Sequence, residues 1–319
     1  MGKIISGLAS SHAYALQEPA QWDMMRQRTM ERYKARFGKY PPLQARIAEE
    51  TSDLREQRYQ RIRSGLEFLK LKIAEQKPDA LILVGDDQDE NFTEDNLPQI
   101  AVYAGGDFSL GKVGPLVSGH KNLLYRNHGA LAADLLNRLV EQEFDVATVK
   151  RFPNDTLLSH AHCQILARMV PAADIPVVLL FLNAIHVPAI GPARCYRLGQ
   201  AIKNIIAQRT DGERVAIYGS GGLSHFTSGY PWEFYQGPHD VGSISEEFDC
   251  KVVSLIASGQ GEKLAQLSSA DLLSNGEIEL RSWITVLGAV GSARPQLIVN
   301  EPFYSGVMSM GVAYWAATD

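Results

Sequence analysis

The sequence predicts an α/β protein, with a central mixed sheet flanked by helices. Short apolar segments of strand length alternate along the chain with segments whose apolar residues recur at helical spacing. No internal repeat, low-complexity tract or linker divides the 319 residues, which are enough to bury a large core. We therefore expect residues 1–319 to form a single domain.

Four apolar segments end directly before side chains that carry chemistry. They are Ile4–Ala9 before Ser10-Ser11-His12, Ala80–Val84 before Gly85-Asp86-Asp87-Gln88, Pro176–Leu182 before Asn183, and Val215–Tyr218 before a glycine-rich run that ends at His225. In open α/β sheets, ligands bind beyond the carboxyl ends of the strands. The four strand ends therefore predict one shared active site.

An N-terminal helical insertion, at about residues 13–77, is expected between the first two strands. One helix is predicted at about 22–37, and a second from the helical spacing of Ile62, Leu66, Leu69 and Ile73, which stops before Pro78. Two interpretations of the insertion are open. It is either a helical hairpin that packs on the sheet, or a lid that supplies a ligand with Trp22, Arg26 or Tyr33.

Four longer helices are expected after the insertion, over residues 128–142, 197–209, 246–258 and 277–290. Apolar side chains recur on one face of each, as at Leu131, Leu135 and Leu139. On the last helix Glu279 and Trp283 are four residues apart, so they share a face.

Composition excludes several functional classes. The net charge is -5, from 31 basic and 36 acidic residues, and no basic run suggests a nucleic-acid surface. The three cysteines are too widely spaced for a disulfide framework or a zinc knuckle. The chain enters a strand at once, without the apolar region of a signal peptide, and no later apolar run approaches the roughly 20 residues of a membrane span. We therefore expect a cytoplasmic protein that binds neither nucleic acid nor membrane.

The acidic run at the second strand end has two open interpretations. Asp86, Asp87, Asp89 and Glu90 follow an apolar strand within five residues. Buried carboxylates at this density repel one another and take up protons unless solvent or a cation surrounds them. The run is therefore either a solvated turn or part of a metal site.

Three histidines and one glutamate are candidates for catalysis. His225 follows a glycine loop that lets backbone approach a ligand, and its ordinary pKa of about 6.5 suits a general acid/base. His12 is either a structural histidine or a metal ligand. His160 and a further, alternating histidine, His162, are candidates for a second polar contact to a ligand, and either of them is alternatively structural. Glu279 is either a surface glutamate or the carboxylate of a two-histidine, one-carboxylate Fe(II) site. The glycine loop contains no G-x-S-x-G motif, which disfavours a serine hydrolase of the α/β type.

Taken together, these segments resemble the class III extradiol ring-cleaving dioxygenases, the superfamily of the protocatechuate 4,5-dioxygenase catalytic subunit. The matching pieces run in order along nearly the whole chain and are Ser11-His12, Gly85–Gln88, the segment from His160 to Val178, Ser220–Phe226, Glu246–Asp249, Glu279–Trp283 and Met310–Ala313. Within the superfamily, Asp86-Asp87-Gln88 together with Pro192–Gly199 is most similar to the single-chain 3-O-methylgallate dioxygenase branch.

The resemblance implies Fe(II) held by two histidines and one glutamate, with His12 as the first ligand and Glu279 as the carboxylate ligand. It also implies His225 as the acid/base catalyst and His160 in contact with dioxygen or the substrate. The sequence departs from the family at the second ligand, where the family's Asn-Asp-His becomes Asp86-Asp87-Gln88. Three outcomes are open: Gln88 coordinates through its oxygen, one of Asp86, Asp87 and Glu90 replaces it, or the site binds metal poorly. We expect a working site with Gln88 in or beside the metal's coordination sphere.

The expected function is Fe(II)-dependent extradiol (meta) cleavage, with O2, of a catecholic aromatic acid such as 3-O-methylgallate, gallate or protocatechuate, by a homodimer. Arg26 or Arg32 would pair with the substrate carboxylate. The alternatives are a hydroxypyridone or aminophenol substrate, a non-catalytic binding protein of the same fold, and a zinc hydrolase at the same cluster.

Overall fold

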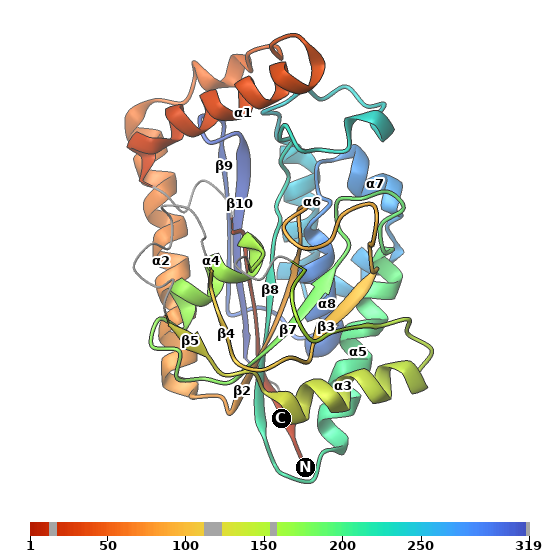
Figure 1. Ribbon diagram of the computed structural model, residues 1–319. Coiled ribbons are helices and arrows are strands. Elements are labelled where there is room, and N and C mark those ends of the chain that lie inside the picture. The colour runs from red at the N-terminus through yellow and green to blue at the C-terminus, as the bar shows by residue number, and fades with distance from the viewer. Residues whose placement is uncertain (13–17, 112–122, 154–157, 317–319) are drawn as a thin grey trace.

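An eight-stranded mixed sheet forms the centre of the molecule (Figure 1). The computed structural model describes residues 1–12, 18–111, 123–153 and 158–316. In spatial order, the strands are β6 (Ala147–Val149), β3 (Ile100–Tyr103), β7 (Val177–Leu182), β2 (Ala80–Asp86), β8 (Arg214–Ser220), β1 (Lys3–Ser10), β10 (Met308–Ala316) and β9 (Leu297–Phe303). The predicted α/β class with a mixed central sheet is confirmed.

The four strands expected from the sequence lie side by side in this sheet. β7, β2, β8 and β1 are neighbours and run parallel, whereas β3 is antiparallel to β7 and β10 is antiparallel to β1. Their carboxyl ends therefore meet at one edge of the sheet, as expected. A separate two-stranded sheet pairs β4 (Phe108–Ser109) with β5 (Leu124–Tyr125).

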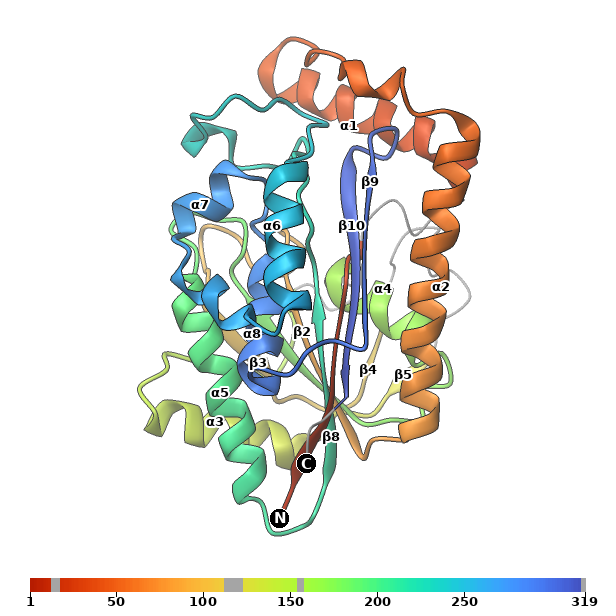
Figure 2. The ribbon, with the colours of Figure 1, turned by 180° about the vertical axis from the view of Figure 1, so that it is seen from behind.

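Helices cover both faces of the sheet (Figures 1 and 2). On one face lie α2 (Ser52–Gln76) and α4 (His160–Met169), and on the other α3 (Gly129–Glu141), α5 (Pro192–Gln208), α6 (Glu246–Ala257) and α8 (Leu280–Val290). Side chains of β2 alternate between the two cores: Leu81 and Leu83 join the first, and Ile82 and Val84 the second. Each such apolar side chain, fully buried, contributes about 1.5–3 kcal/mol.

Two glycines bring α5 and α8 into close contact. A Cβ at Gly199 would lie 1.9 Å from the carbonyl oxygen of Thr285, and one at Gly288 would lie 2.0 Å from that of Tyr196. Each glycine therefore admits the backbone of the other helix. This contact fixes α8, and with it Glu279, which directly precedes the helix.

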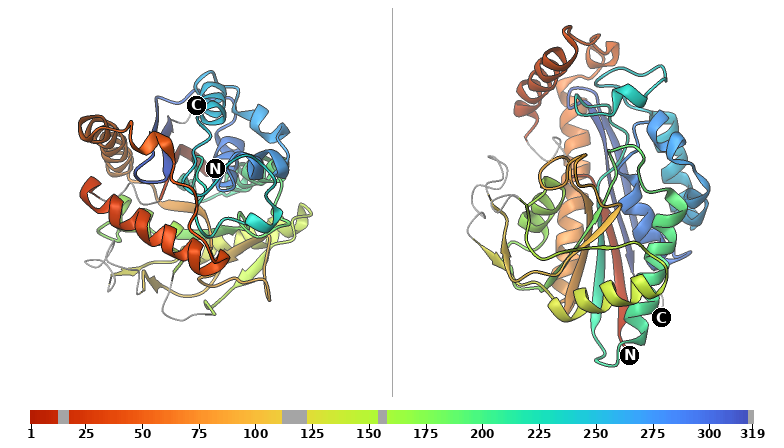
Figure 3. Two further views of the ribbon diagram at one scale, coloured as in Figure 1. Left: turned by 90° about the horizontal axis from the view of Figure 1, so that it is seen from above. Right: turned by 45° about the vertical axis from the view of Figure 1, so that its right-hand side comes forward.

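The insertion only partly matches the helical hairpin predicted to pack on the sheet. α2 packs on β9 and β10 and buries the four predicted apolar residues, Ile62, Leu66, Leu69 and Ile73. The side chain of Thr51 caps its first turn, and the helix ends at Lys77, in the left-handed conformation, before Pro78. α1 (Trp22–Phe37), in contrast, lies across one end of the molecule (Figure 3), where Trp22 packs on Phe303 at the end of β9.

Several boundaries and elements differ from the sequence prediction. α5 begins at Pro192, five residues earlier than expected, because proline suits the first turn of a helix. α8 begins at Leu280 rather than at residue 277, which places Glu279 before the helix. β3, β6, β9, β10 and α4 were not predicted. β3 and β6 are too short to show a periodicity, and β10 is buried on both faces, so its apolar residues do not alternate with polar ones.

The short helix α7 (Ser269–Ser274) begins at a capping box between Ser268 and Asp271. The remaining short elements are the 3-10 helices η2 (Pro19–Gln21), η3 (Ala45–Ile47), η5 (Trp232–Phe234) and η6 (Gly261–Gln266). Across the described ranges, every helix is too short or too polar to cross a bilayer.

Candidate metal centre

Three of the strand-end and helix-start residues converge on one point. His12 follows β1, Asp86 is the last residue of β2, and Glu279 directly precedes α8. Each offers one ligand atom, and these atoms all lie within 4.8 Å of one another. All three residues are 3% exposed, so bulk water cannot satisfy them. A neutral imidazole and two carboxylates at this spacing form a donor set for a divalent cation.

The hydrogen bonds of His12 fix its tautomer. Ser220 Oγ donates to the carbonyl oxygen of Ala161 at 2.6 Å, so it must accept from His12 Nδ1 at 3.1 Å. Nε2 then carries the lone pair, and it lies 3.8 Å from Glu279 Oε2. Burial lowers the pKa of His12 to about 4, against the attraction of Glu279. His12 is therefore a neutral imidazole with a free lone pair inside the cluster, as a metal ligand requires.

The glycine loop after β8 holds Glu279 from the other side. Gly222 N donates to Glu279 Oε2 at 3.1 Å, and Trp283 Nε1 donates to the carbonyl oxygen of Gly221 at 2.8 Å. Glu279 and Trp283 thus both contact this loop. A Cβ on Gly221 would lie 2.8 Å from Glu279 Cβ, and the φ of +141° at Gly221 is rarely adopted by other residues.

His225 stands on the opposite side of the Glu279 carboxylate from His12. Its Nδ1 donates to the carbonyl oxygen of Leu223 at 2.7 Å, and its Nε2 lies 3.1 Å from Glu279 Oε1. Burial by itself lowers the pKa of His225, but the charge of Glu279 and the hydrogen bond to it outweigh burial and raise the pKa to about 9. Burial by itself raises the pKa of Glu279, but the charge of His225 and the hydrogen bond to it outweigh burial and hold this pKa below its usual range.

His160 is the most accessible histidine of the cluster. It is the first residue of α4, its side chain is 34% exposed, and its ring meets that of His12 edge-on at 4.8 Å between centroids. Both its backbone N and its Nδ1 bond to Glu90 Oε1. Burial acts to lower the pKa of His160, but the hydrogen bond to Glu90 and its charge raise it to about 9. Glu90 therefore fixes the ring and keeps it protonated, with Nε2–H as the remaining donor.

Gln88 lies between the two carboxylates of the cluster. Its Nε2 donates to Asp86 Oδ2 at 2.9 Å and to Glu279 Oε1 at 2.8 Å. Since both partners are carboxylate oxygens, the amide directs its N–H groups, and not its carbonyl oxygen, into the cluster. Asp86 Oδ1, in contrast, is buried and has no hydrogen-bond partner among the described residues. Burial and then the charge of Glu279 raise the pKa of Asp86 to about 8.

The other two acidic alternatives are engaged elsewhere. Asp87 accepts from the backbone N of Asn91 at 2.8 Å and of Phe92 at 3.0 Å, so it shapes the turn after β2. Glu90 bonds to His160 and to the backbone N of Gln88. Neither carboxylate joins the group of three donors.

Two further residues named from the sequence have structural positions. Asn183 binds the backbone of the loop after β7, accepting from His186 N at 3.0 Å and donating to its carbonyl oxygen at 2.8 Å. His162 is fully buried between Ser159 and the carbonyl oxygen of Leu180. Of the two alternating histidines on α4, only His160 reaches the cluster.

The insertion residues named as lid candidates lie apart from the metal centre. Trp22 is buried against Tyr59 and Phe303. Arg26 pairs with Asp23 at 2.9 Å and donates to the carbonyl oxygen of Ser305, and Arg32 is exposed. α1 does meet the loop that follows His225, through Arg36 and through the ring contact of Tyr33 with Trp232.

Sequence reasoning missed the small residues that orient the cluster. Ser220 fixes the His12 tautomer, and Ser11 Oγ joins two chain segments by accepting from Gly311 N at 2.9 Å and bonding to the carbonyl oxygen of Gly222. The run Ser220-Gly221-Gly222 was visible as a motif. The partner of each group was not, because these contacts join residues 57 to 300 positions apart.

Comparison with known proteins identifies the family of the chain. Residues 14–314 match the family model described as the catalytic LigB subunit of aromatic ring-opening dioxygenase. The chain belongs to this family. The LigB family assignment thus covers nearly the whole sheet and every residue of the cluster except His12, and the predicted class III extradiol superfamily is confirmed.

Among relatives of this LigB-family chain is a gallate dioxygenase of Pseudomonas putida, 24% identical over 52% of this chain and 46% of that protein. The chain thus spans about half the length of this relative. A 2,3-dihydroxyphenylpropionate/2,3-dihydroxicinnamic acid 1,2-dioxygenase of Burkholderia vietnamiensis is 25% identical over 68% of this chain and 77% of that protein. The crystal structure of an uncharacterized protein from Escherichia coli K12 shares the fold, with a TM-score of 0.53 at 16% identity over 98% of this chain and 100% of that one.

Proposed function

We propose that this protein is an extradiol dioxygenase that opens the ring of a catecholic aromatic acid such as gallate, 3-O-methylgallate or protocatechuate, with Fe(II) as its metal. The observation that carries the proposal is the convergence of His12, Asp86 and Glu279 beside His160 and His225 at the strand ends. Membership of the LigB family and the names of the gallate and dihydroxyphenylpropionate relatives support it.

The residues present fit a divalent cation. Asp86 Oδ1 is an orphaned buried oxygen, and the lone pair of His12 Nε2 faces Glu279 Oε2. We propose His12, Asp86 and Glu279 as the ligands, with Asp86 in the place for which the sequence suggested Gln88. Gln88 would then hold the two carboxylates in position through its N–H groups. Bound Fe(II) would supply the redox chemistry with O2 and accept both hydroxyl groups of a catechol.

The chain's own residues would position the substrate and move its protons. His225 is anchored through Nδ1, so only Nε2 can exchange a proton with a substrate hydroxyl. The hydrogen bond from Nδ1 to the carbonyl oxygen of Leu223 would keep the ring in place while Nε2 loses and regains this proton. His160, kept protonated by Glu90 and partly exposed, would donate a hydrogen bond from Nε2 to negative charge that develops on the reactants.

Oxygen consumption tests this proposal. Protein loaded anaerobically with Fe(II) should consume O2 when gallate, 3-O-methylgallate or protocatechuate is added, and should form an ultraviolet-absorbing ring-opened product. His225→Ala should keep its metal and lose most of the turnover, about 10²- to 10⁴-fold for a general acid/base. His128→Asn is the matched control, because His128 caps α3 and bonds to Glu213, away from the cluster.

Two results would overturn the proposal. The first is a folded, iron-loaded protein that consumes no O2 with any of a broad panel of catechols, hydroxypyridones and aminophenols. The second is turnover that persists in His225→Ala but is lost in His128→Asn. We also propose that residues 1–319 act as one catalytic domain and that the chain forms a homodimer, which light scattering would test.

A further inference from the structure

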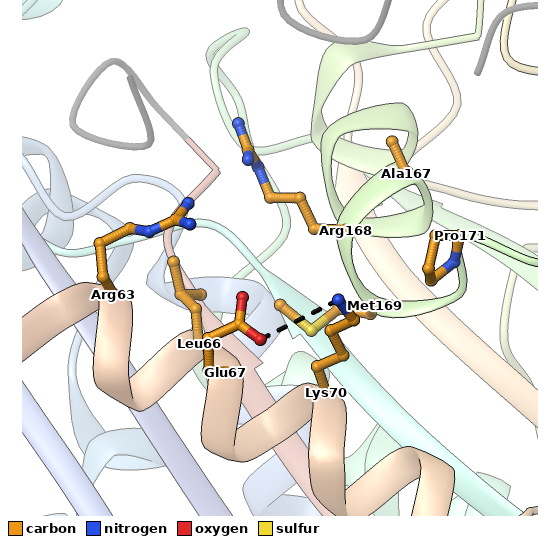
Figure 4. A pocket seen from close by; sticks show the side chains of 8 residues that line it. All are labelled: Arg63, Leu66, Glu67, Lys70, Ala167, Arg168, Met169 and Pro171. Carbon is orange, nitrogen blue, oxygen red and sulfur yellow. Dashed lines mark ion pairs between the residues drawn. The ribbon is translucent and has the colours of Figure 1, made fainter. Parts of the chain in front are cut away.

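A cavity between α2 and α4 gathers positive charge outside the metal centre. It has a volume of about 220 Å³, and Arg63 and Lys70 on α2 face Arg168 on α4 across it (Figure 4). Glu67 is the only carboxylate in this lining among the described residues, and it lies 3.9 Å from Lys70 Nζ. Three cations against one carboxylate leave the cavity with a net positive charge.

Arg168 is the least satisfied of these cations. Its Nε is buried and has no hydrogen-bond partner within the described part of the chain. Burial, followed by the like charge of Arg63, lowers the pKa of its guanidinium. A buried N–H group without an acceptor costs free energy, which a bound anion would offset.

We propose that this cavity binds a small oxyanion, a phosphate or a carboxylate group, between Arg168 on one helix and Arg63 and Lys70 on the other. The planar fork of N–H donors on an arginine matches the geometry of both groups. The cavity is smaller than the roughly 300–1,000 Å³ of pockets for drug-sized ligands, so the ligand is a compact anion. Leu66 and Met169 add buried apolar side chains to the same lining.

The position of the cavity connects it to the metal centre. α4 begins at His160, and Arg168 follows eight residues later, about 12 Å along the helix axis. Ser220, which orients His12, also bonds to the carbonyl oxygen of Ala161 on this helix. An anion that bridges α2 and α4 would therefore fix the end of α4 opposite His160.

Thermal unfolding and titration calorimetry of the full-length protein test the site. Inorganic phosphate, acetate and succinate are added at constant ionic strength, which KCl maintains. We expect at least one of these anions to raise the midpoint of unfolding above that in KCl alone and to bind with measurable heat. Comparison of phosphate with acetate and succinate shows whether the site prefers a phosphate or a carboxylate group. Arg168→Gln should weaken this binding at least tenfold, and Arg168→Lys should retain part of it.

The controls separate binding from a structural role. Lys203→Gln, an exposed position on α5 on the other side of the sheet, should leave anion binding unchanged. Without added anion, Arg168→Gln should be as stable as the parent protein, because the substitution removes a half-buried cation whose Nε has no hydrogen-bond partner among the described residues. If Arg168→Gln fails to fold, Arg63→Gln and Lys70→Gln provide the same test. The proposal is overturned if no anion raises the midpoint beyond KCl, or if the rise is equal in the parent and the glutamine variants.

Discussion

Replacement of Gln88 by leucine tests whether this residue is itself a metal ligand or holds two carboxylates in position. The side chain keeps its approximate size but loses both N–H donors. Glu279 is ionised, so the 2.8 Å bond to it is charge-assisted and contributes about 1.5–3 kcal/mol. Asp86, whose pKa is raised to about 8, is largely neutral at pH 7 in the metal-free protein, so the 2.9 Å bond to it contributes about 1 kcal/mol.

The expected loss is smaller than this sum. Gln88 is half-buried, so water can reach part of the site and satisfy the carboxylates once the amide is gone. We expect Gln88→Leu to lower the free energy of unfolding of the metal-free protein by about 2 kcal/mol. For 319 residues, with an unfolding entropy of about 2.1 cal/mol/K per residue, this corresponds to about 3 °C in the unfolding midpoint.

Metal affinity distinguishes a ligand from a residue that positions ligands. If Asp86 is the ligand, Gln88→Leu should change metal affinity by about tenfold at most, whereas Asp86→Asn should lower it by more than about 100-fold. Asp86→Asn should barely change the stability of the metal-free protein, because it replaces a largely neutral carboxyl by a neutral amide. Chelator competition under anaerobic conditions measures the affinities. Gln99→Leu, which removes one exposed bond to the carbonyl oxygen of Pro188, is the control.

The opposite pattern would refute the assignment. If Gln88→Leu loses metal by about 100-fold while Asp86→Asn retains it, the amide oxygen of Gln88 is the ligand. The hydrogen-bond orientation described above would then have to reverse when metal binds.

Three further predictions concern the same centre. Gly221→Ala should destabilise the protein by about 1–3 kcal/mol and weaken metal binding, because the φ of this residue is +141° and the new Cβ would lie 2.8 Å from Glu279 Cβ. Gly106→Ala, with open space around the new Cβ, should change neither stability nor metal binding. Equal unfolding midpoints for the two variants would contradict this prediction. In the metal-free protein, the raised pKa of His160 contributes stability that is fully present below about pH 6.5 and is lost as pH rises through about 9. Denaturation at several pH values should therefore show the stability difference between the parent and Glu90→Gln shrinking over that range. A constant difference would show that Glu90 does not control this titration. Metal at 100 times its Kd should stabilise the protein by about 2.7 kcal/mol, which corresponds to a rise of about 4 °C in the unfolding midpoint, and a chelator should reverse this rise. In Glu279→Gln the metal should raise the midpoint only slightly, because a ligand is lost. A rise in that variant equal to that of the parent would exclude Glu279 as a ligand.

The sequence by itself determined the fold class and the set of side chains from which the site is built. Apolar runs of strand length mark β1, β2, β7 and β8 wherever they lie in space, because a buried parallel strand needs apolar side chains on both faces. Since parallel strands end at a common edge, the sequence is sufficient to place His12, the acidic run and His225 together. Glu279 could be placed there only through the family resemblance, because its local sequence is that of any helix start.

Only the tertiary structure determined which role each of these side chains has. Asp86, Asp87, Gln88 and Glu90 lie within five residues of one another, yet their roles differ. Asp86 joins the group of three donors and has an orphaned oxygen, and Asp87 shapes a turn. Gln88 bridges two carboxylates, and Glu90 pairs with His160. The tautomer of His12 depends on Ser220, 208 residues away. Hydrogen-bond direction and burial depend on neighbours that are distant along the chain, and no local pattern encodes them. The physical identity of a residue limits what it can donate or accept, and its packed surroundings select which of those options it uses.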